Sequence, residues 1–180
     1  DKYKIKCIGV NCLGVYDSYN ELNTFFLPKN KLKLPKKGSV SIISQSGGLG
    51  LALFNLAQGE NLGISKFVSY GNATNVDESD LLEYLNKDNK TKVICLYLEG
   101  VINGKKFFET LKKIKKPVIV VKGGLTEEGK KATLSHTGSL AGSAQIYLGI
   151  FNQTNLIYAE NLSEMFQYAK IFEKIKSIGK

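Results

Sequence analysis

Short apolar runs alternate with stretches of helical periodicity from Gly38 to the end of the chain, and this alternation constrains the fold more than any other feature. The runs are apolar at successive positions, which is typical of strands buried on both faces of a parallel sheet. We expect five strands, at residues 40–43, 67–70, 92–98, 117–121 and 156–158, and five helices, at residues 49–56, 78–85, 105–114, 141–151 and 162–175. Right-handed crossovers between them predict an α/β fold, a five-stranded, parallel, doubly wound, flavodoxin-like sheet with helices on both faces.

Residues 1–37 do not share this pattern. Pro28 and Pro35 bracket a lysine-rich stretch, and proline together with like charge is typical of a linker. We therefore interpret residues 1–37 as the end of a preceding domain with its linker, and residues 38–180 as the α/β domain. Because the chain does not begin with Met, we expect it to be part of a longer protein.

Charge and composition exclude several classes of function. The 25 basic residues are all lysine and give a net charge of +9, but specific base readout depends on arginine, so we expect no nucleic-acid partner. The longest apolar run, near residues 118–121, is far shorter than the roughly 20 residues of a membrane helix. Three cysteines and one histidine do not supply a zinc site, and we expect a reducing, cytoplasmic setting.

Ligands of doubly wound sheets bind at the carboxyl ends of the strands, so the loops there are the candidate site. The first is Ser44-Gln45-Ser46-Gly47-Gly48, in which a strand ends and a helix begins. The free N–H groups of that helix can hold a phosphate, glycines let an anion approach the backbone, and Ser46 can donate a hydroxyl. The alternative is a glycine turn with a serine helix cap.

His136 is the only histidine and lies in a long loop of small, polar residues. A neutral imidazole is a nucleophile near pH 7 and can accept a phosphoryl group. His136 cannot belong to a histidine-rich metal site, because there is no second histidine. A Ser-His-Asp hydrolase stays open in principle, although the G-x-S-x-G pattern is absent.

Glu99 ends an apolar strand and precedes a glycine. It is either a solvated strand end or a carboxylate that binds one imidazole nitrogen and leaves the other free to react. We expect its strand to neighbour the one before His136. Gly71-Asn72 and Gly123-Gly124 each follow a strand and are either tight turns or part of an anion pocket.

Together these segments resemble the ADP-forming acyl-CoA (acetyl-CoA) synthetases, which belong with the succinyl-CoA synthetases. The matching segments are residues 9–14, 44–48, 69–72, 77–85, 97–100, 116–117 and 135–142, in the same order and spacing. One departure is Val10, where the family usually has proline.

The resemblance implies a phosphohistidine at His136, with Glu99 holding and polarising the imidazole. It implies that Ser46, Gly47 and Gly48 bind the phosphate, and less strongly that Gly123 and Gly124 do. It further implies that acyl-CoA, ADP and phosphate are interconverted with acid, CoA and ATP, with acetate as the expected acid. Nucleotide and Mg²⁺ would be bound mainly by an ATP-grasp domain or subunit, which this chain lacks, in an oligomeric enzyme; alone, the chain would be inactive.

Two other interpretations remain open. Related sequences form a regulatory module of protein lysine acetyltransferases, and such modules often lose the histidine. The chain is also compatible with a non-catalytic assembly domain. The presence of His136 together with Glu99 favours the synthetase.

Overall fold

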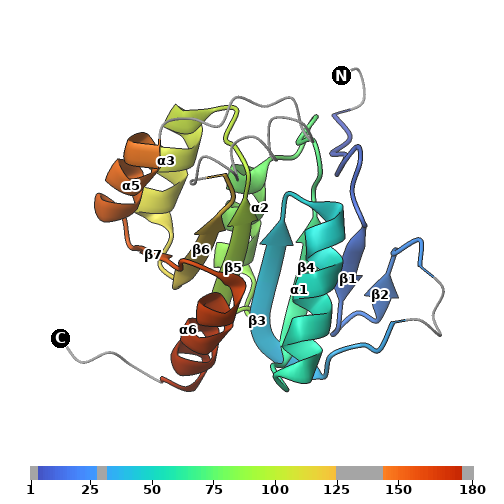
Figure 1. Cartoon of the computed structure of the whole chain (residues 1–180). Helices are drawn as coiled ribbons and strands as arrows, with labels where there is room; N and C mark the ends of the chain where they lie inside the picture. Colours follow the sequence, from blue (N-terminus) through green and yellow to red (C-terminus); the bar gives the residue numbers. More distant parts are fainter. Residues whose placement is uncertain (1–3, 28–31, 125–143, 176–180) are drawn as a thin grey trace.

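The protein is built around one mixed sheet, seen here in a computed structural model that describes residues 4–27, 32–124 and 144–175 (Figure 1). Within these residues the sheet has seven strands in the order β2-β1-β4-β3-β5-β6-β7. The strands are β1 (Val15–Asp17), β2 (Leu22–Asn23), β3 (Lys37–Ser44), β4 (Ile64–Ser69), β5 (Val93–Leu98), β6 (Val118–Lys122) and β7 (Leu156–Tyr158).

Strands β3 to β7 pair in parallel, and β3 lies between β4 and β5. The expected α/β fold is therefore present, but the expected five-stranded, all-parallel sheet is wrong as a description of the whole sheet. Strand β1 pairs antiparallel with β4, and β2 pairs antiparallel with β1, so two strands extend one edge. They have three and two residues, which is too short for a readable period.

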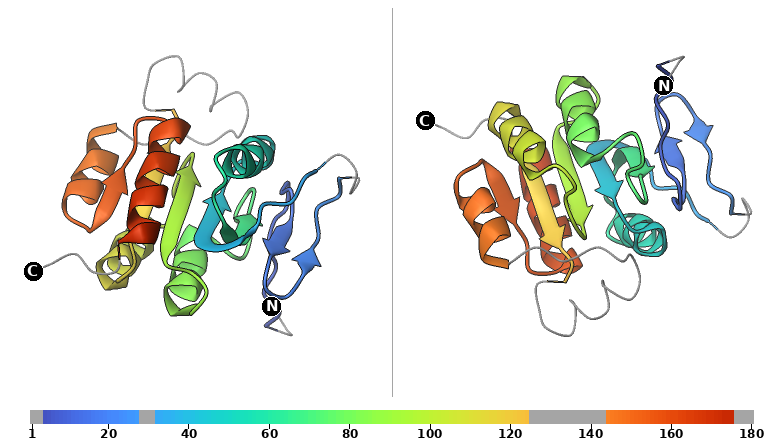
Figure 2. Two further views of the ribbon diagram at one scale, coloured as in Figure 1. Left: turned by 90° about the horizontal axis from the view of Figure 1, so that it is seen from below. Right: turned by 90° about the horizontal axis from the view of Figure 1, so that it is seen from above.

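The helices form a layer on each face of the sheet (Figures 1 and 2). They are α1 (Gly47–Gly59), α2 (Glu78–Lys87), α3 (Gly104–Lys113), α5 (Ala144–Asn152) and α6 (Leu162–Lys174). Helices α1 and α6 pack on one face through residues such as Phe54 and Phe166. Helices α2, α3 and α5 pack on the other face through residues such as Leu82, Phe107 and Phe151.

The helix starts follow from capping residues in the sequence. Asp77 caps α2 in a capping box with Asp80, and Asn103 and Asn161 cap α3 and α6. Inside α1, a Cβ on Gly50 would lie 2.8 Å from the Phe67 ring. Glycine at that position therefore lets α1 lie close against the sheet.

The N-terminal segment packs against this sheet. The Tyr16 and Phe25 rings make edge contacts with Phe54 of α1, at centroid distances of 5.2 and 5.4 Å. Strand β2 is held to β1 through Thr24, whose Oγ1 accepts from the Val15 amide at 2.8 Å. A domain boundary near residue 37 stays a prediction.

Neither a membrane-spanning helix nor a metal-binding cluster is present among the described residues. No helix among them is long and apolar enough to cross a membrane. The same ranges contain no group of three or more His, Cys, Asp and Glu side chains arranged to hold a metal ion.

Candidate functional site

The carboxyl ends of four parallel strands meet at one edge of the sheet, the upper edge in Figure 1. Ser44 at the end of β3 is in register with Tyr97 of β5, and Leu98 of β5 with Lys122 of β6. A cleft of about 480 Å³ opens at this edge. It is lined by residues 11–13 and 26–27 on one side, by residues 45–48 at the start of α1, and by the loops at residues 71–72 and 99–100.

Ser46, Gly47 and Gly48 all line this cleft. Ser46 is the N-cap of α1, and its Oγ accepts a hydrogen bond from the Leu49 amide at 3.3 Å. The serine cap is therefore observed, and it leaves the first amides of α1 at the cleft. A Cβ on Gly48 would meet no atom within 4 Å, so its backbone is open to an incoming group. Helix N-terminal amides with a favourable dipole suit a phosphate, but phosphate binding here stays a prediction.

Glu99 lines the same cleft, directly after β5. The side chain of Gln45 holds its backbone, because Gln45 Oε1 accepts from the Glu99 amide at 2.7 Å and from the Gly100 amide at 2.9 Å. The backbone N–H group of Gln45 in turn donates to the Tyr97 carbonyl oxygen at 3.1 Å. The turn after β3 and the end of β5 thus form one fixed unit.

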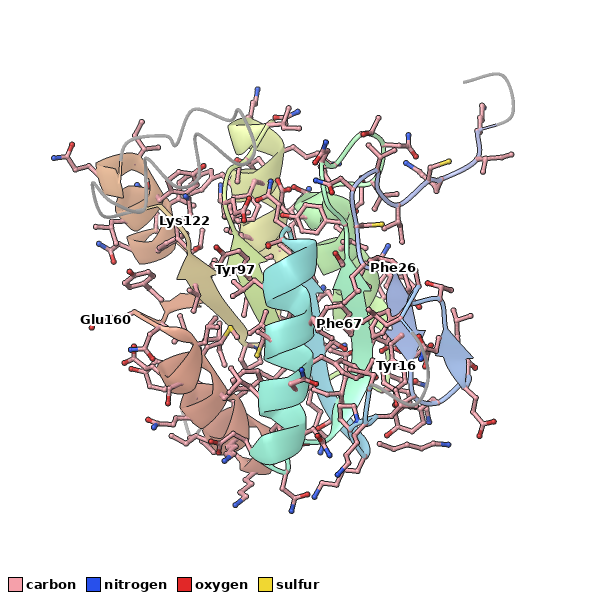
Figure 3. All side chains as sticks on the ribbon, turned by 45° about the vertical axis from the view of Figure 1, so that its right-hand side comes forward. Tyr16, Phe26, Phe67, Tyr97, Lys122 and Glu160 are labelled. Carbon is pink, nitrogen blue, oxygen red and sulfur yellow. The ribbon has the colours of Figure 1, made fainter. Side chains whose placement is uncertain are left out.

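The electrostatic environment of Glu99 is shown by its neighbours. Burial raises the pKa of Tyr97 to about 12, and the Glu99 carboxylate adds to this shift. Burial lowers the pKa of Lys122 to about 8, and the same carboxylate opposes that shift. Figure 3 labels both side chains. The Glu99 carboxylate therefore acts electrostatically on both a phenol and an ammonium group.

Gly123 and Gly124 directly follow β6. The described residues that line the cleft do not include them. The Gly123 amide continues the pairing with β5, donating to the Leu98 carbonyl at 2.8 Å. A Cβ on Gly123 would lie 2.6 Å from the Tyr97 hydroxyl, and Gly124 has a φ of +74°. Gly123 is thus explained by its close approach to Tyr97 and Gly124 by its positive φ, and an anion-binding role for them stays a prediction.

His136 lies outside the described residues. The pairing of β5 with β6 confirms that the strand carrying Glu99 neighbours the strand that precedes His136 in the sequence. Contact between the two side chains stays a prediction.

The N-terminal segment forms a cleft wall that sequence reasoning did not anticipate. Asn72 connects the two sides: its amide donates to the Val10 carbonyl at 3.0 Å, and its Oδ1 accepts from Asn11 Nδ2 at 3.3 Å. Gly71 has a φ of +59°, and a Cβ there would lie 2.1 Å from the Val10 carbonyl oxygen. The turn is therefore formed with Val10 in the position where proline is usual. The glycines in the motifs at residues 9–14 and 69–72 are the sequence signal from which this close approach could have been inferred.

A buried carboxyl lies behind the site at the start of α2. Glu78 is 2% exposed, and burial raises its pKa to about 7, with a further rise from Asp77. Its neighbour Tyr70 is fully buried, with a pKa well above its usual value because of burial and the charge of Glu78. The two groups interact through their charge, but among the described residues the Tyr70 hydroxyl has no partner of normal hydrogen-bond geometry.

This arrangement defines a doubly wound α/β domain whose cleft at the carboxyl edge combines a helix N-terminus with a carboxylate. Residues 37–172 match the family model of the succinyl-CoA ligase like flavodoxin domain. The chain belongs to that family.

Two curated relatives are similar over nearly the whole chain. The chain is 43% identical to the alpha subunit of acetate–CoA ligase [ADP-forming] II of Pyrococcus furiosus, covering 95% of this chain and 37% of the relative. It is 44% identical to acetate–CoA ligase [ADP-forming] of Methanocaldococcus jannaschii, covering 99% of this chain and 25% of the relative. The expected resemblance to ADP-forming acyl-CoA synthetases is confirmed.

A solved structure agrees with these relatives. The dinucleotide forming acetyl-coenzyme A synthetase 1 of Ca. Korarchaeum cryptofilum, in complex with phosphate and ADP, superposes with a TM-score of 0.87 at 40% identity. The match covers 96% of this chain and 37% of that one. This chain thus spans between a quarter and two fifths of the length of these three proteins.

Proposed function

We propose that this chain is the phosphohistidine-carrying part of an ADP-forming acyl-CoA synthetase with acetate as its acid. The observation that supports this most is the fixed position of Glu99 in a cleft that also contains the N-terminus of α1. One group suits an imidazole, and the other suits a phosphoryl group. The strand next to Glu99 leads along the sequence to His136.

The proposed reaction has three reversible steps. A phosphate oxygen attacks the thioester carbon of acyl-CoA, the C–S bond breaks, and CoA leaves as its thiolate. A His136 nitrogen then attacks the phosphorus of the acyl phosphate, the bond between phosphorus and the acyl oxygen breaks, and the free acid leaves. In the last step a β-phosphate oxygen of ADP attacks the same phosphorus, the N–P bond breaks, and ATP forms.

The residues of this chain stabilise charge during these transfers. The first amides of α1, at Gly47 and Gly48, would bind the phosphoryl oxygens, since preorganised N–H donors stabilise charge on a transferring group. The Glu99 carboxylate would accept a hydrogen bond from the N–H group of the imidazole and hold the ring in one orientation. Gly123 would let the chain pass closely beside Tyr97, in the strand before Glu99, and Gly124 would let it turn there.

The remaining parts of the enzyme would lie outside this chain. We assign nucleotide and Mg²⁺ mainly to an ATP-grasp domain or subunit, and CoA to a preceding domain that ends within residues 1–37. The complete enzyme would be an oligomer. A reaction that draws on ATP and CoA, in a chain with three free cysteines among the described residues, fits the cytoplasm.

The test uses the complete protein with its ATP-grasp part. It is incubated with γ-labelled ATP and Mg²⁺, and the label on the protein is tested in acid and in base. A phosphohistidine gives acid-labile, base-stable label that is absent from His136→Asn. An unchanged synthetase rate in His136→Asn would exclude the proposal and favour a regulatory or assembly role.

A further inference from the structure

The backbone around Glu99 is also held from the side opposite Gln45. Lys122 Nζ donates a hydrogen bond to the Glu99 carbonyl oxygen at 2.7 Å and a second one to the Gly123 carbonyl oxygen. The Tyr147 hydroxyl of α5 accepts from the Val101 amide at 3.1 Å. Side chains from two further elements therefore bind the same short loop.

Lys122 occupies a buried position, with only 5% of the residue exposed. Burying an ammonium group is costly unless its donors and charge are satisfied. Two carbonyl oxygens accept hydrogen bonds from the ammonium group. Its nitrogen also lies 4.7 Å from the centre of the Tyr147 ring, on the negative face of the aromatic system. With a pKa of about 8, the ammonium group is largely protonated at neutral pH and can donate both hydrogen bonds.

We propose that Lys122 is a positioning residue for Glu99, joining the end of β5 to the end of β6 through the Glu99 and Gly123 carbonyls. This inference rests on the proposed function, in which Glu99 orients the reacting imidazole. In this proposal Lys122 acts through Glu99 and its backbone, not on the reacting atoms.

The position of Lys122 in the sheet determines which two segments it connects. Lys122 is the last residue of β6, in register with Leu98, the residue before Glu99. The chain after Gly123 leads along the sequence toward His136. A single ammonium group therefore ties the segment that carries the carboxylate to the segment that precedes the histidine.

Removing the ammonium group would remove its hydrogen bonds to the Glu99 and Gly123 carbonyls and so loosen the connection between the ends of the two strands. A displacement of the order of 1 Å at a reacting centre lowers rates by about 100-fold. The loss should appear in the rate of phosphoryl transfer, whereas binding of ATP to the ATP-grasp part should be unaffected.

The experiment measures single-turnover phosphorylation of the complete protein by γ-labelled ATP, together with kcat and KM. Lys122→Met keeps the length and apolar stem but removes the donors. Lys113→Met is the matched control, since Lys113 lies exposed at the far end of α3. Lys122→Gln retains N–H donors on a shorter side chain and replaces the Met variant if that protein does not fold.

Lys122→Met is expected to lower the phosphorylation rate about 10- to 100-fold with KM for ATP unchanged, and Lys122→Gln to lower it less. In a Glu99→Gln background the same substitution should change the rate less than about twofold, because residues that act as a unit are not additive. A wild-type rate in Lys122→Met, or the same fold-loss in both backgrounds, would overturn the proposal. Retained phosphorylation in His136→Asn would instead mean that the proposed function has failed.

Discussion

The side-chain oxygen of Gln45 accepts hydrogen bonds from two successive backbone amides, those of Glu99 at 2.7 Å and Gly100 at 2.9 Å. One residue of the turn after β3 thereby sets the direction in which β5 delivers its terminal carboxylate. Gly47 and Gly48 place the start of α1 at the cleft, and Gln45 provides the link to the backbone of Glu99.

Gln45→Met should weaken both the fold and the proposed activity. The substitution leaves two amides at the cleft without their acceptor, which costs about 1–3 kcal/mol of unfolding free energy. Phosphorylation should slow about 10- to 100-fold because Glu99 is displaced. Urea unfolding and single-turnover labelling measure the two effects. Gln58→Met, on the exposed side of α1, is the control and should behave as wild type.

Because Gly123 lies close to Tyr97, a side chain at position 123 should destabilise the fold, and a smaller side chain at position 97 should restore stability. Gly123→Ala places its Cβ 2.6 Å from the Tyr97 hydroxyl oxygen, so we expect a loss of about 1–3 kcal/mol in unfolding free energy. Tyr97→Phe removes that oxygen and should recover most of the loss in the double variant. Gly59→Ala, where a Cβ meets no atom within 4 Å, should be neutral or stabilising. If Tyr97→Phe gives no recovery in denaturant melts, the clash is not the cause.

Glu78 predicts a pH-dependent penalty on stability. Its folded pKa of about 7 lies above the ordinary value of 4.5, so between these values the folded state binds more protons than the unfolded state. Stability contributed by this group is full below about pH 4.5 and decreases as the pH rises to about 7, by on the order of 3 kcal/mol in total.

Glu78→Gln removes this titration. The difference in unfolding free energy between variant and wild type, measured by urea titration, should shift in favour of the variant between pH 5 and pH 8. A difference that stays constant over this range would mean that Glu78 ionises normally in the folded protein.

Lys66 tests whether β1 is an integral part of the sheet. Its ammonium nitrogen lies 3.0 Å from an Asp88 carboxylate oxygen and 3.4 Å from one of Asp17 in β1, and all three side chains are nearly buried. Lys66→Met leaves two buried carboxylates without a counterion and should cost about 3–5 kcal/mol. Lys92→Met, at an exposed position, should cost almost nothing. A small loss in Lys66→Met would show that the edge strands contribute little to the folded state.

The parallel part of the fold could be read from the sequence because its strands are continuous apolar runs between amphipathic helices. Strands β1 and β2 could not, since they are three and two residues long and pair with the sheet over only a few residues. Ser46, Gly47, Gly48 and Glu99 were predicted from their place after strands, and the structure brings them to one cleft.

The contributions of Gln45 and Lys122 could not be predicted in the same way. Gln45 stands in a motif whose serines and glycines are already accounted for by a turn and a helix cap. The sequence does not indicate which backbone groups a glutamine side chain will bind. Lys122 is one of 25 basic residues, and only the structure shows that its ammonium group faces inward. Gly123 and Gly124 were identified, but the structure explains Gly123 by its close approach to Tyr97 and Gly124 by its positive φ, and the described residues that line the cleft do not include them.

The central claim is that His136 carries a phosphoryl group during turnover. The most direct test is to incubate the complete protein with ATP and Mg²⁺, digest it at alkaline pH, and locate the modification by fragmentation mass spectrometry. The account predicts the added mass of one phosphoryl group on His136, its loss on addition of ADP, and slower formation in Glu99→Gln. A phosphoryl group on another residue, or none while the ATP-grasp part binds ATP, would contradict it.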